Sequence, residues 1–458
     1  MSELRLSARN VPHALPPGWA WVNIGELQPE FQNGASSRGE AGGTPTIVLR
    51  LADVINGQIS LAKPRRVLLS DQTREKYRAA QDDILVIRVN GSKEITGQFI
   101  LCNVDDLVFC DHFIRMRIAD DLAHPRYLAA LSNSSLIRRQ IEQSLVSTAG
   151  QNTINQSRLR SILIPLPPRI EQERIVAAIE QHLSRIDAGV AALQSARTRV
   201  LSLVKAVLLA AVPDEPPLGW TTVTVGEAGE VRLGRQRSPR FHRGPHMRPY
   251  LRVANVFEDR IDTSDVMTMH FSDEEFAQYR LEPGDILLNE GQSPHLLGRP
   301  AMYRGDPPNV AFTNSLLRFR ANTGVLPEWA LLVFRRHLHA KRFMRESQIT
   351  TNIAHLSAGR FKNIEFPIPS VDEQRRILIS VDEKLSLLAA MLITLDQQRV
   401  RASTIRSAIL AAAFSGRLVP QDPSDEPASV LMGRIASERA ASNAHRPSIK
   451  PGITKVTA

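Results

Sequence analysis

The chain has 458 residues, of which 43% are apolar, enough for about three domains with packed cores. Its two cysteines, Cys102 and Cys110, exclude a disulfide framework and lack the partners of a tetrahedral metal site, so we expect a reducing cytoplasm and no metal. Lysine and arginine (57) outnumber aspartate and glutamate (47), and the net charge of +10 favours a polyanionic partner such as nucleic acid, although a merely basic soluble protein has the same balance.

The chain begins with residues 1–14, which we expect to be a loose tail because they lack the apolar core of a signal peptide. No apolar run in the sequence approaches the roughly 20 residues that a membrane span needs. Short apolar runs then alternate with polar, glycine-rich loops: WAWVNI, TIVLRLADV, ILVIRV, QFILCNV and LVFCDHFIRMRI. These runs predict strands, and helices follow near Pro125 to Ser144. The pattern indicates a mixed α/β domain.

A proline-rich joint ends this domain, in the stretch IPLPPRIEQERIVAAI (Ile164 to Ile179). Its prolines hold the chain extended and exclude a helix, whereas Glu171 lies where the first turn of a new helix favours a carboxylate. From Ile175 to Ala211, apolar residues recur in steps of three and four, the spacing of a coiled-coil seam. Arg197 interrupts the seam, and Pro213 ends the predicted helix.

The whole pattern then recurs with a period of about 202 residues. FPIPSVDEQRRILISV (Phe366 to Val381) has six of sixteen residues in common with the first joint, and Ser370 with Glu373 has capping-box spacing. LRVANVFEDRI repeats LRLADVINGQI, and YRLEPGDIL repeats YRAAQDDIL. A second seam runs from Ile377 to Ile409, with Arg399 in the interrupting slot and Gly416 as a candidate helix terminator.

The sequence therefore predicts an α+β fold with a pseudo-twofold internal repeat: two tandem α/β domains separated by two long antiparallel helices that form a coiled-coil spacer. The alternative is that each long helix packs only on its own domain.

The loops differ between the copies more than the strands do. The segment from Arg232 to Arg252 holds seven arginines and no acidic residue, which suits phosphates and guanine edges. Other loops rich in Asn, Gln and Ser occur in both copies, although a single arginine is more often a solvated surface charge than a base reader. The candidate DNA-binding residues are Arg38, Arg50, Lys93, Gln98, Gln151, Asn152, Arg232, Arg235, Arg237, Arg240, Arg243, Arg252, Asn289, Gln292, Arg299, Asn352 and His355.

Signatures of catalysis are missing from the sequence. It has no Walker phosphate loop, no G-x-S-x-G elbow, no H-E-x-x-H and no paired-cysteine motif. Asp306-Pro307-Pro308-Asn309 resembles the D-P-P-aromatic motif of amino-methyltransferases, but Asn309 offers no ring to stack on a flipped base, so we expect a proline-rich turn. The sequence predicts no catalytic residue.

With the duplication and both joints in place, the chain resembles the DNA specificity subunit of type I restriction–modification systems. The joints PLPPRIEQERI and PIPSVDEQRRI resemble that family's boundary between recognition domain and conserved helix, and AILAAAFSGRLVPQDPSDEPASVLMGRI resembles its distal conserved region. The expected parts are an N-terminal tail 1–14, recognition domains 15–169 and 215–370, conserved helices 170–214 and 371–416, a C-terminal conserved segment 417–440 and a disordered tail 441–458.

The resemblance implies a non-catalytic subunit that reads a bipartite DNA target, with the helices acting as a ruler between the two half-sites. It also implies two copies of an adenine methyltransferase subunit and a restriction/translocase subunit as partners, which would bind S-adenosylmethionine and ATP. Two competing hypotheses are a stand-alone DNA-binding regulator with a coiled-coil dimer interface, and an enzyme acting on nucleic acid.

Overall fold

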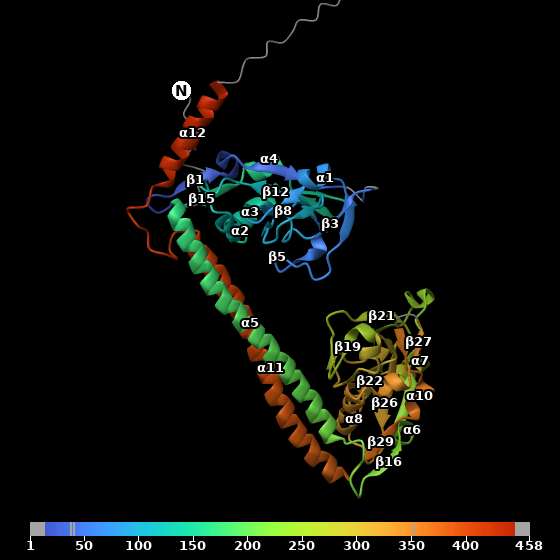
Figure 1. Ribbon diagram of the computed structural model, residues 1–458. Coiled ribbons are helices and arrows are strands. Elements are labelled where there is room, and N and C mark those ends of the chain that lie inside the picture. The colour runs from blue at the N-terminus through green and yellow to red at the C-terminus, as the bar shows by residue number, and fades with distance from the viewer. Residues whose placement is uncertain (1–13, 37–38, 40–41, 351–352, 445–458) are drawn as a thin grey trace, which may run out of the picture. The chain divides into compact units, whose positions relative to one another are not determined.

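The computed structural model describes residues 14–36, 39, 42–350 and 353–444. The chain forms two compact units (Figure 1). Unit 1 comprises Met1–Ala191 together with Arg399–Ala458, and unit 2 comprises Ala192–Gln398. Each unit therefore combines one globular domain with parts of both long helices.

Unit 1 opens with a mixed α/β domain whose elements follow one another closely. In chain order they are β1 (Ala20–Asn23), β2 (Glu30–Asn33), β3 (Thr44–Leu49), β4 (Val54–Ile55), β5 (Gln58–Ile59), β6 (Arg66–Leu69), α1 (Asp71–Lys76), β7 (Arg78–Ala79), β8 (Ile84–Ile87), β9 (Val89–Asn90), β10 (Phe99–Leu101), β11 (Leu107–Phe109), β12 (Phe113–Arg117), α2 (Pro125–Leu131), α3 (Ser135–Ser144), β13 (Val146–Thr148), β14 (Gln151–Thr153), α4 (Gln156–Arg160) and β15 (Leu163–Leu166). Short 3₁₀ helices precede β2 and β4, at Ile24–Leu27 and Leu51–Asp53.

Unit 2 repeats this order. Its elements are β16 (Thr221–Thr224), α6 (Val225–Ala228), β17 (Gly229–Leu233), β18 (Met247–Leu251), β19 (Val256–Phe257), β20 (Arg260–Ile261), β21 (Met267–His270), α7 (Asp273–Tyr279), β22 (Ile286–Asn289), β23 (Gly291–Gln292), β24 (Pro300–Met302), β25 (Ala311–Phe312), β26 (Leu316–Ala321), α8 (Pro327–His339), α9 (Arg342–Arg345), β27 (Gln348–Thr350), β28 (Ile353–His355), α10 (Ala358–Lys362) and β29 (Glu365–Ile368). Short 3₁₀ helices span Pro239–Phe241, Val253–Asn255 and Pro294–Leu296.

Most strand pairings of the two domains correspond, although the counterpart of β7 in the sheet β6-β3-β11-β7 is only an isolated bridge of Arg280 with Ala311 beside the sheet β21-β18-β25. The four-stranded sheet β10-β8-β12-β2 has the same order as β24-β22-β26-β17, and the small sheet β13-β14-β9 matches β27-β28-β23. The antiparallel pair of first and last strands, β1 with β15, recurs as β16 with β29. The internal repeat predicted from the sequence is confirmed at the level of topology.

A glycine at the same place in both domains has a steric cause. A Cβ atom on Gly34 would lie 2.0 Å from the carbonyl oxygen of Cys110, and one on Gly234 would lie 2.2 Å from that of Thr313. No side chain fits at either distance, so the chain after β2 and after β17 can approach the neighbouring segment only through glycine.

The repeated joint connects domain and helix through one buried glutamine. Gln172 accepts a hydrogen bond from the amide of His124 at 2.8 Å and donates one to the carbonyl of Pro167 at 3.0 Å. Gln374 does the same with the amide of Leu326 at 2.9 Å and the carbonyl of Pro369 at 3.0 Å. Both glutamines are fully buried. The motif therefore starts a helix and also fastens it to the segment before α2 or α8.

The long helices are α5 (Arg169–Ala211) and α11 (Val371–Ala413), each of 43 residues. Inside unit 1 the first part of α5 lies alongside the last part of α11, and inside unit 2 the last part of α5 lies alongside the first part of α11 (Figure 1). The pairing is antiparallel, since Arg406 pairs with Asp187 in unit 1 and Arg197 pairs with Asp396 at 3.7 Å in unit 2. The apolar seam positions predicted on both helices are buried or half-buried. The paired-helix prediction is confirmed.

Each helix also contributes to the core of both units. Ile175, Val176 and Ile179 of α5 join Leu410 and Ala413 of α11 in the core of unit 1. Leu208 of α5 and Val381 of α11 join the core of unit 2. The alternative in which each helix packs only on its own domain is wrong, because both cores are completed by both helices.

The C-terminal conserved segment packs into unit 1. Glu171 of α5 accepts hydrogen bonds from the Trp19 indole at 2.9 Å and from Gln421 at 3.3 Å, and Arg174 pairs with Asp425 at 2.5 Å. The amide of Ala428 donates to the carbonyl of Gly18 at 2.8 Å. The segment after α11 is thereby fixed against the first residues of the first domain.

Several expectations differ in detail. The run LVFCDHFIRMRI forms two strands, β11 and β12, because a turn at Asp111–His112 separates them. The last helix, α12 (Ala428–Ala444), continues into the predicted C-terminal tail, of which residues 445–458 lie outside the described residues, as do residues 1–13 of the predicted N-terminal tail. The predicted domain boundaries stay a prediction. Among the described helices, none has the length and apolar content that crossing a membrane requires.

Candidate nucleic-acid interface

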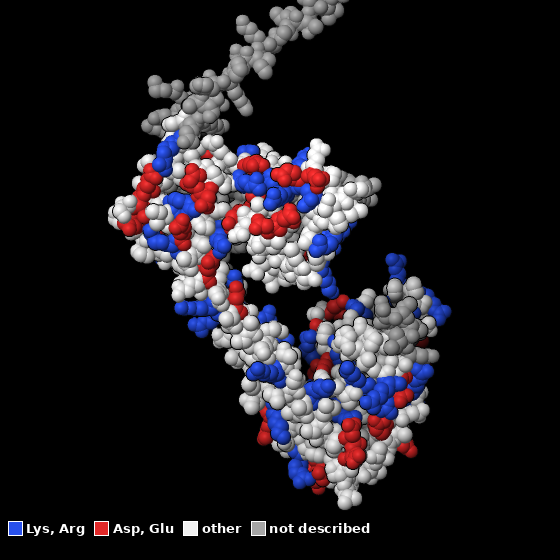
Figure 2. All heavy atoms as spheres, viewed as in Figure 1, with Lys and Arg blue, Asp and Glu red and all other residues white. Residues whose placement is uncertain are grey.

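Charge alone does not mark a binding face on this protein. Figure 2 shows basic and acidic side chains interspersed on the viewed face of both units. Individual side chains differ instead in whether their hydrogen-bonding groups are already used within the protein or remain available to a nucleic acid.

Many of the candidate residues named above are engaged within their own domain. Arg50 pairs with Asp53 at 2.7 Å, and Arg252 pairs with Asp265. Other candidates make hydrogen bonds to nearby groups: Gln98 to the Glu94 carbonyl, Asn152 to the Gly91 carbonyl, Arg232 to Glu230, Asn289 and Arg299 to the Val256 carbonyl, and His355 to Glu290. These bonds stabilise loops and occupy groups that a contact to a base edge would need.

The most buried of the seven arginines, Arg235, has a structural role. Its guanidinium lies 3.8 Å from the centre of the Phe241 ring and 4.7 Å from that of Phe271, and it pairs with Glu275 at 2.8 Å. Only 5% of Arg235 is exposed. The sequence did not distinguish this arginine from its neighbours, because Glu275 lies 40 residues away in the chain.

Most of the remaining candidates that the structure describes are exposed at the surface of their units. Arg237, Arg240 and Arg243 lie on the loop between β17 and β18, with Arg240 over the Phe241 ring at 4.7 Å. Lys93 and Gln151 are exposed in unit 1, and Gln292 is half-buried in unit 2. Arg38 and Asn352 lie outside the described residues. The loop arginines have the exposure that phosphate contacts require.

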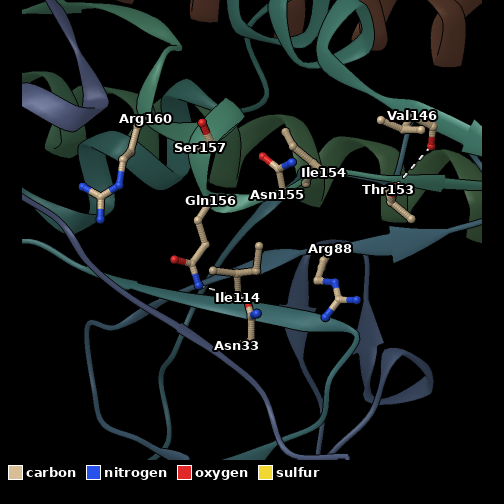
Figure 3. Close-up of a pocket in the computed structure, with 10 residues that line it drawn as sticks. All are labelled: Asn33, Arg88, Ile114, Val146, Thr153, Ile154, Asn155, Gln156, Ser157 and Arg160. Atoms are coloured by element: carbon tan, nitrogen blue, oxygen red, sulfur yellow. Dashed lines mark hydrogen bonds between the residues drawn. The ribbon is translucent and has the colours of Figure 1, made fainter. Parts of the chain in front are cut away.

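Unit 1 contains a cleft of about 840 Å³ that the sequence had not indicated (Figure 3). Its walls come from β2, β12, the β8–β9 junction, the β13–β14 hairpin and α4. The hairpin turns through Ala149 and Gly150, both with positive φ, the geometry of a two-residue type I′ turn. Val146 and Thr153, which pair at the far end of the hairpin from this turn, form one side of the cleft.

Polar groups from segments far apart in the chain meet in this cleft. Gln156, the first residue of α4, donates a hydrogen bond to the side-chain oxygen of Asn33 at the end of β2, at 3.0 Å (Figure 3). Asn155 caps α4 by accepting from the amide of Arg158 at 2.9 Å, and Arg160 lies 4.8 Å from the centre of the Phe31 ring. Arg88, between β8 and β9, completes the polar lining. Amides and guanidinium groups of this kind can contact base edges and phosphates.

The equivalent place in unit 2 carries different chemistry. Strand pairing matches Val89 with Thr153 in unit 1 and Gly291 with His355 in unit 2. Arg88 precedes β9 in unit 1, and Glu290 precedes β23 in unit 2. The carbonyl of Arg88 accepts a hydrogen bond from the amide of Ile154, and the carbonyl of Glu290 accepts one from the amide of Leu356. Glu290 pairs with His355 at 3.3 Å. One topological position therefore presents a cation in one domain and a carboxylate in the other.

A second cleft in unit 1, of about 500 Å³, lies beside Arg50 and the turn after β11. There Cys110, Asp111 and His112 each place one potential metal ligand atom within 4.8 Å of the others. A structural zinc site takes four ligands, one more than this group provides. Burial raises the pKa of the Cys110 thiol, which opposes formation of the thiolate that a metal would bind. The expectation of no metal stays a prediction.

Comparison with known proteins places this geometry in a family. The sequence model of the type I restriction modification DNA specificity domain matches residues 54–191 and 217–390, once in each copy of the repeat and over more than half of the chain. The StySPI specificity subunit of Salmonella potsdam is 38% identical over 205 residues, which span 44% of this chain and 44% of that relative. The EcoKI specificity subunit of Escherichia coli K12 is 24% identical over 398 residues, 82% of this chain and 85% of that relative.

Two solved structures have the same fold. A chain from a type I restriction–modification system, studied for its complex assembly and conformational transition, superposes with a TM-score of 0.70 at 20% identity, covering 89% of this chain and all of that one. The HsdS subunit of Thermoanaerobacter tengcongensis superposes with a TM-score of 0.52 at 21% identity, covering 89% of this chain and 99% of that one. The resemblance drawn from the joints and the duplication is confirmed: this chain belongs to the family of type I restriction–modification DNA specificity subunits.

Proposed function

We propose that this chain is the DNA specificity subunit of a type I restriction–modification complex and reads a bipartite target, one half-site with each recognition domain. The observation that carries the proposal is that the DNA specificity family matches each copy of the repeat separately. Two domains of equal topology with different side chains at equivalent positions suit a target whose halves differ in sequence. The subunit would read its DNA target in the cytoplasm.

The proposed partners are two adenine methyltransferase subunits and a restriction/translocase subunit, docked on the long helices. Apart from the seam, these helices expose large apolar side chains, including Leu387 (65% exposed), Ile393 (60%) and Val400 (69%). Leu201, Leu203, Ile379, Met391 and Ile405 add to this exposed apolar surface on α5 and α11. Apolar side chains left in solvent along a helix pair are typical of a surface that a partner covers.

Catalysis and its cofactors are assigned to those partners. The sequence has no phosphate-binding loop for ATP and no aromatic residue in its D-P-P-N segment. That segment lies in an irregular stretch between β24 and β25, where the carbonyl of Pro307 accepts a hydrogen bond from Tyr303 at 2.6 Å. S-adenosylmethionine and ATP are therefore expected on the methyltransferase and restriction subunits.

Co-purification and methylome mapping test the proposal together. The tagged chain is expected to retain an adenine methyltransferase from its host, and deletion of its gene is expected to remove one bipartite methylation motif from the genome. A stand-alone regulator would purify without a methyltransferase and leave the methylome intact. Methyl transfer or cleavage by the isolated chain would contradict the assignment of catalysis to the partners.

Docking on the helices has its own test. Replacing Leu387 and Ile393 by serine is expected to reduce methyltransferase retention without lowering the thermal stability of the chain. Ala390→Ser, at an exposed position of the same helix, is the matched control. Equal retention by the double variant and the control would contradict docking at this surface.

The proposed ruler role can be tested at a known point of the helix register. Arg197 and Asp396 lie opposite each other, so seven residues inserted beside each of them lengthen both helices together and preserve the heptad seam. The insertion adds about 10 Å of helix, roughly the rise of three base pairs. A longer gap between unchanged half-sites is expected, and an unchanged gap would refute the role.

A further inference from the structure

One guanidinium in the unit 1 cleft has no task within the protein. Arg88 is half-buried, and no described residue hydrogen-bonds to its side chain or forms an ion pair with it. Arginine side chains elsewhere in this protein are commonly paired, as Arg117 is with Asp83 at 2.7 Å and Arg115 with Glu30 at 2.7 Å. The guanidinium donors of Arg88 therefore remain available to a ligand that supplies hydrogen-bond acceptors.

The backbone holds Arg88 firmly in this position. Its amide donates to the carbonyl of His112 at 2.7 Å, and its own carbonyl accepts from the amide of Ile154 at 3.0 Å. The residue is thus fixed between the sheet that contains β8 and the strand β14. A backbone anchored between rigid elements sets the point from which the side chain presents its donors, which recognition of a base edge requires.

Gln156 is oriented in the same cleft by a different bond. Its amide nitrogen donates to Asn33, a partner 123 residues away in sequence, which leaves its oxygen and one N–H without a described partner. Figure 3 shows Gln156 reaching from α4 towards Asn33, with Arg88 lining the same cleft. An amide held in this way keeps the acceptor and donor pair that matches adenine.

We infer that Arg88 and Gln156 are the base-reading residues of the first recognition domain, contacting guanine and adenine edges in the major groove of one half-site. Arginine donates two hydrogen bonds to the O6 and N7 atoms of guanine, and glutamine pairs with the N6 and N7 atoms of adenine. The inference rests on the proposed function and adds the residues that give it sequence preference. Neither residue was among those selected from the sequence.

The same inference explains why the copies differ here. Glu290 takes the place of Arg88 in the second domain, where its Oε2 atom pairs with His355 at 3.3 Å. Its other carboxylate oxygen can accept from the N4 amino group of cytosine but repels guanine O6 and the phosphates. The two domains thus share one topological position for base reading and differ in the base they select.

Methylome mapping of the complete complex tests the inference. Wild-type, Arg88→Ala and Gln156→Ala complexes are each expressed in a host that lacks other adenine methylation, and methylated adenines are mapped. Each variant is expected to lose about 10- to 100-fold of its discrimination at one purine position of one half-site. The other half-site is expected to stay unchanged, which also shows that the variant complex is folded and assembled.

Three controls separate the outcomes. Glu290→Gln is expected to change the second half-site alone. Lys93→Ala is expected to weaken modification of all targets without changing the motif. Arg88→Lys is expected to preserve the charge while losing the bidentate contact. An unchanged motif in both alanine variants, or loss of both half-sites together, would overturn the inference. A wild-type complex that methylates no bipartite motif would instead contradict the proposed function itself.

Discussion

The buried glutamine of each joint supports a prediction whose size follows from its contacts. Gln374 is fully buried and satisfies the amide of Leu326 at 2.9 Å and the carbonyls of Gly324 at 2.9 Å and Pro369 at 3.0 Å. In the variant Gln374→Leu an apolar side chain of similar volume fills the site but satisfies none of these backbone groups. Each group left unsatisfied costs about 1–3 kcal/mol when it is buried.

Because some of these groups lie near the surface and regain water, we expect a total loss of about 2–4 kcal/mol of unfolding free energy. For a unit of this size, 1 kcal/mol shifts the melting temperature by about 2–4 °C, so the transition of unit 2 is expected to fall by roughly 4–16 °C. Differential scanning calorimetry measures this, since it separates the transitions of a chain that has two units.

Gln397→Leu is the matched control, because Gln397 is exposed on the same helix α11. Gln172→Leu should also lower the transition of unit 1, by a smaller amount, since Gln172 makes two bonds where Gln374 makes three. If Gln374→Leu melts within about 1 °C of the control, the two joints are not fastened by their glutamines and the argument from burial fails.

Three other predictions concern charge and titration. Arg240→Ala and Arg243→Ala should each reduce the slope of log Kobs against log salt for DNA binding by about 1 and leave the melting temperature unchanged. Arg235→Ala should instead lower the melting temperature, because the ring contacts and the ion pair of Arg235 are lost. Equal salt slopes in all variants would contradict the loop contacts. Burial raises the pKa of Cys102 to about 11, so at pH 8 about one thiol in a thousand is ionised and iodoacetamide should label Cys102 only after unfolding, as peptide mass spectrometry can measure. Burial also raises the pKa of Glu171 above its ordinary 4.5, against the opposing hydrogen bonds from Trp19 and Gln421. The folded state then binds the Glu171 proton more tightly than the unfolded state does. The stability of the wild type relative to Glu171→Gln should therefore be greatest below pH 4.5 and decline as pH rises through the folded-state pKa. A stability difference that does not depend on pH would refute this prediction.

The sequence by itself determined the repeat, the joints and the paired helices. Prolines at 165, 167 and 168 act on their own backbone, and the seam from Ile175 onward depends on a spacing of three and four residues, so both signals are local and can be read in one dimension. The strands followed from short apolar runs for the same reason.

Tertiary structure alone decided which polar side chains remain available to a ligand. Arg235 and Arg240 are alike in sequence, yet Glu275 and two aromatic rings bury the first and leave the second exposed. Gln156 became a candidate only because folding brings Asn33 beside it across 123 residues. Whether a polar group is paired depends on neighbours distant in the chain, and the electrostatic cost of an unpaired group arises only once burial has removed its water.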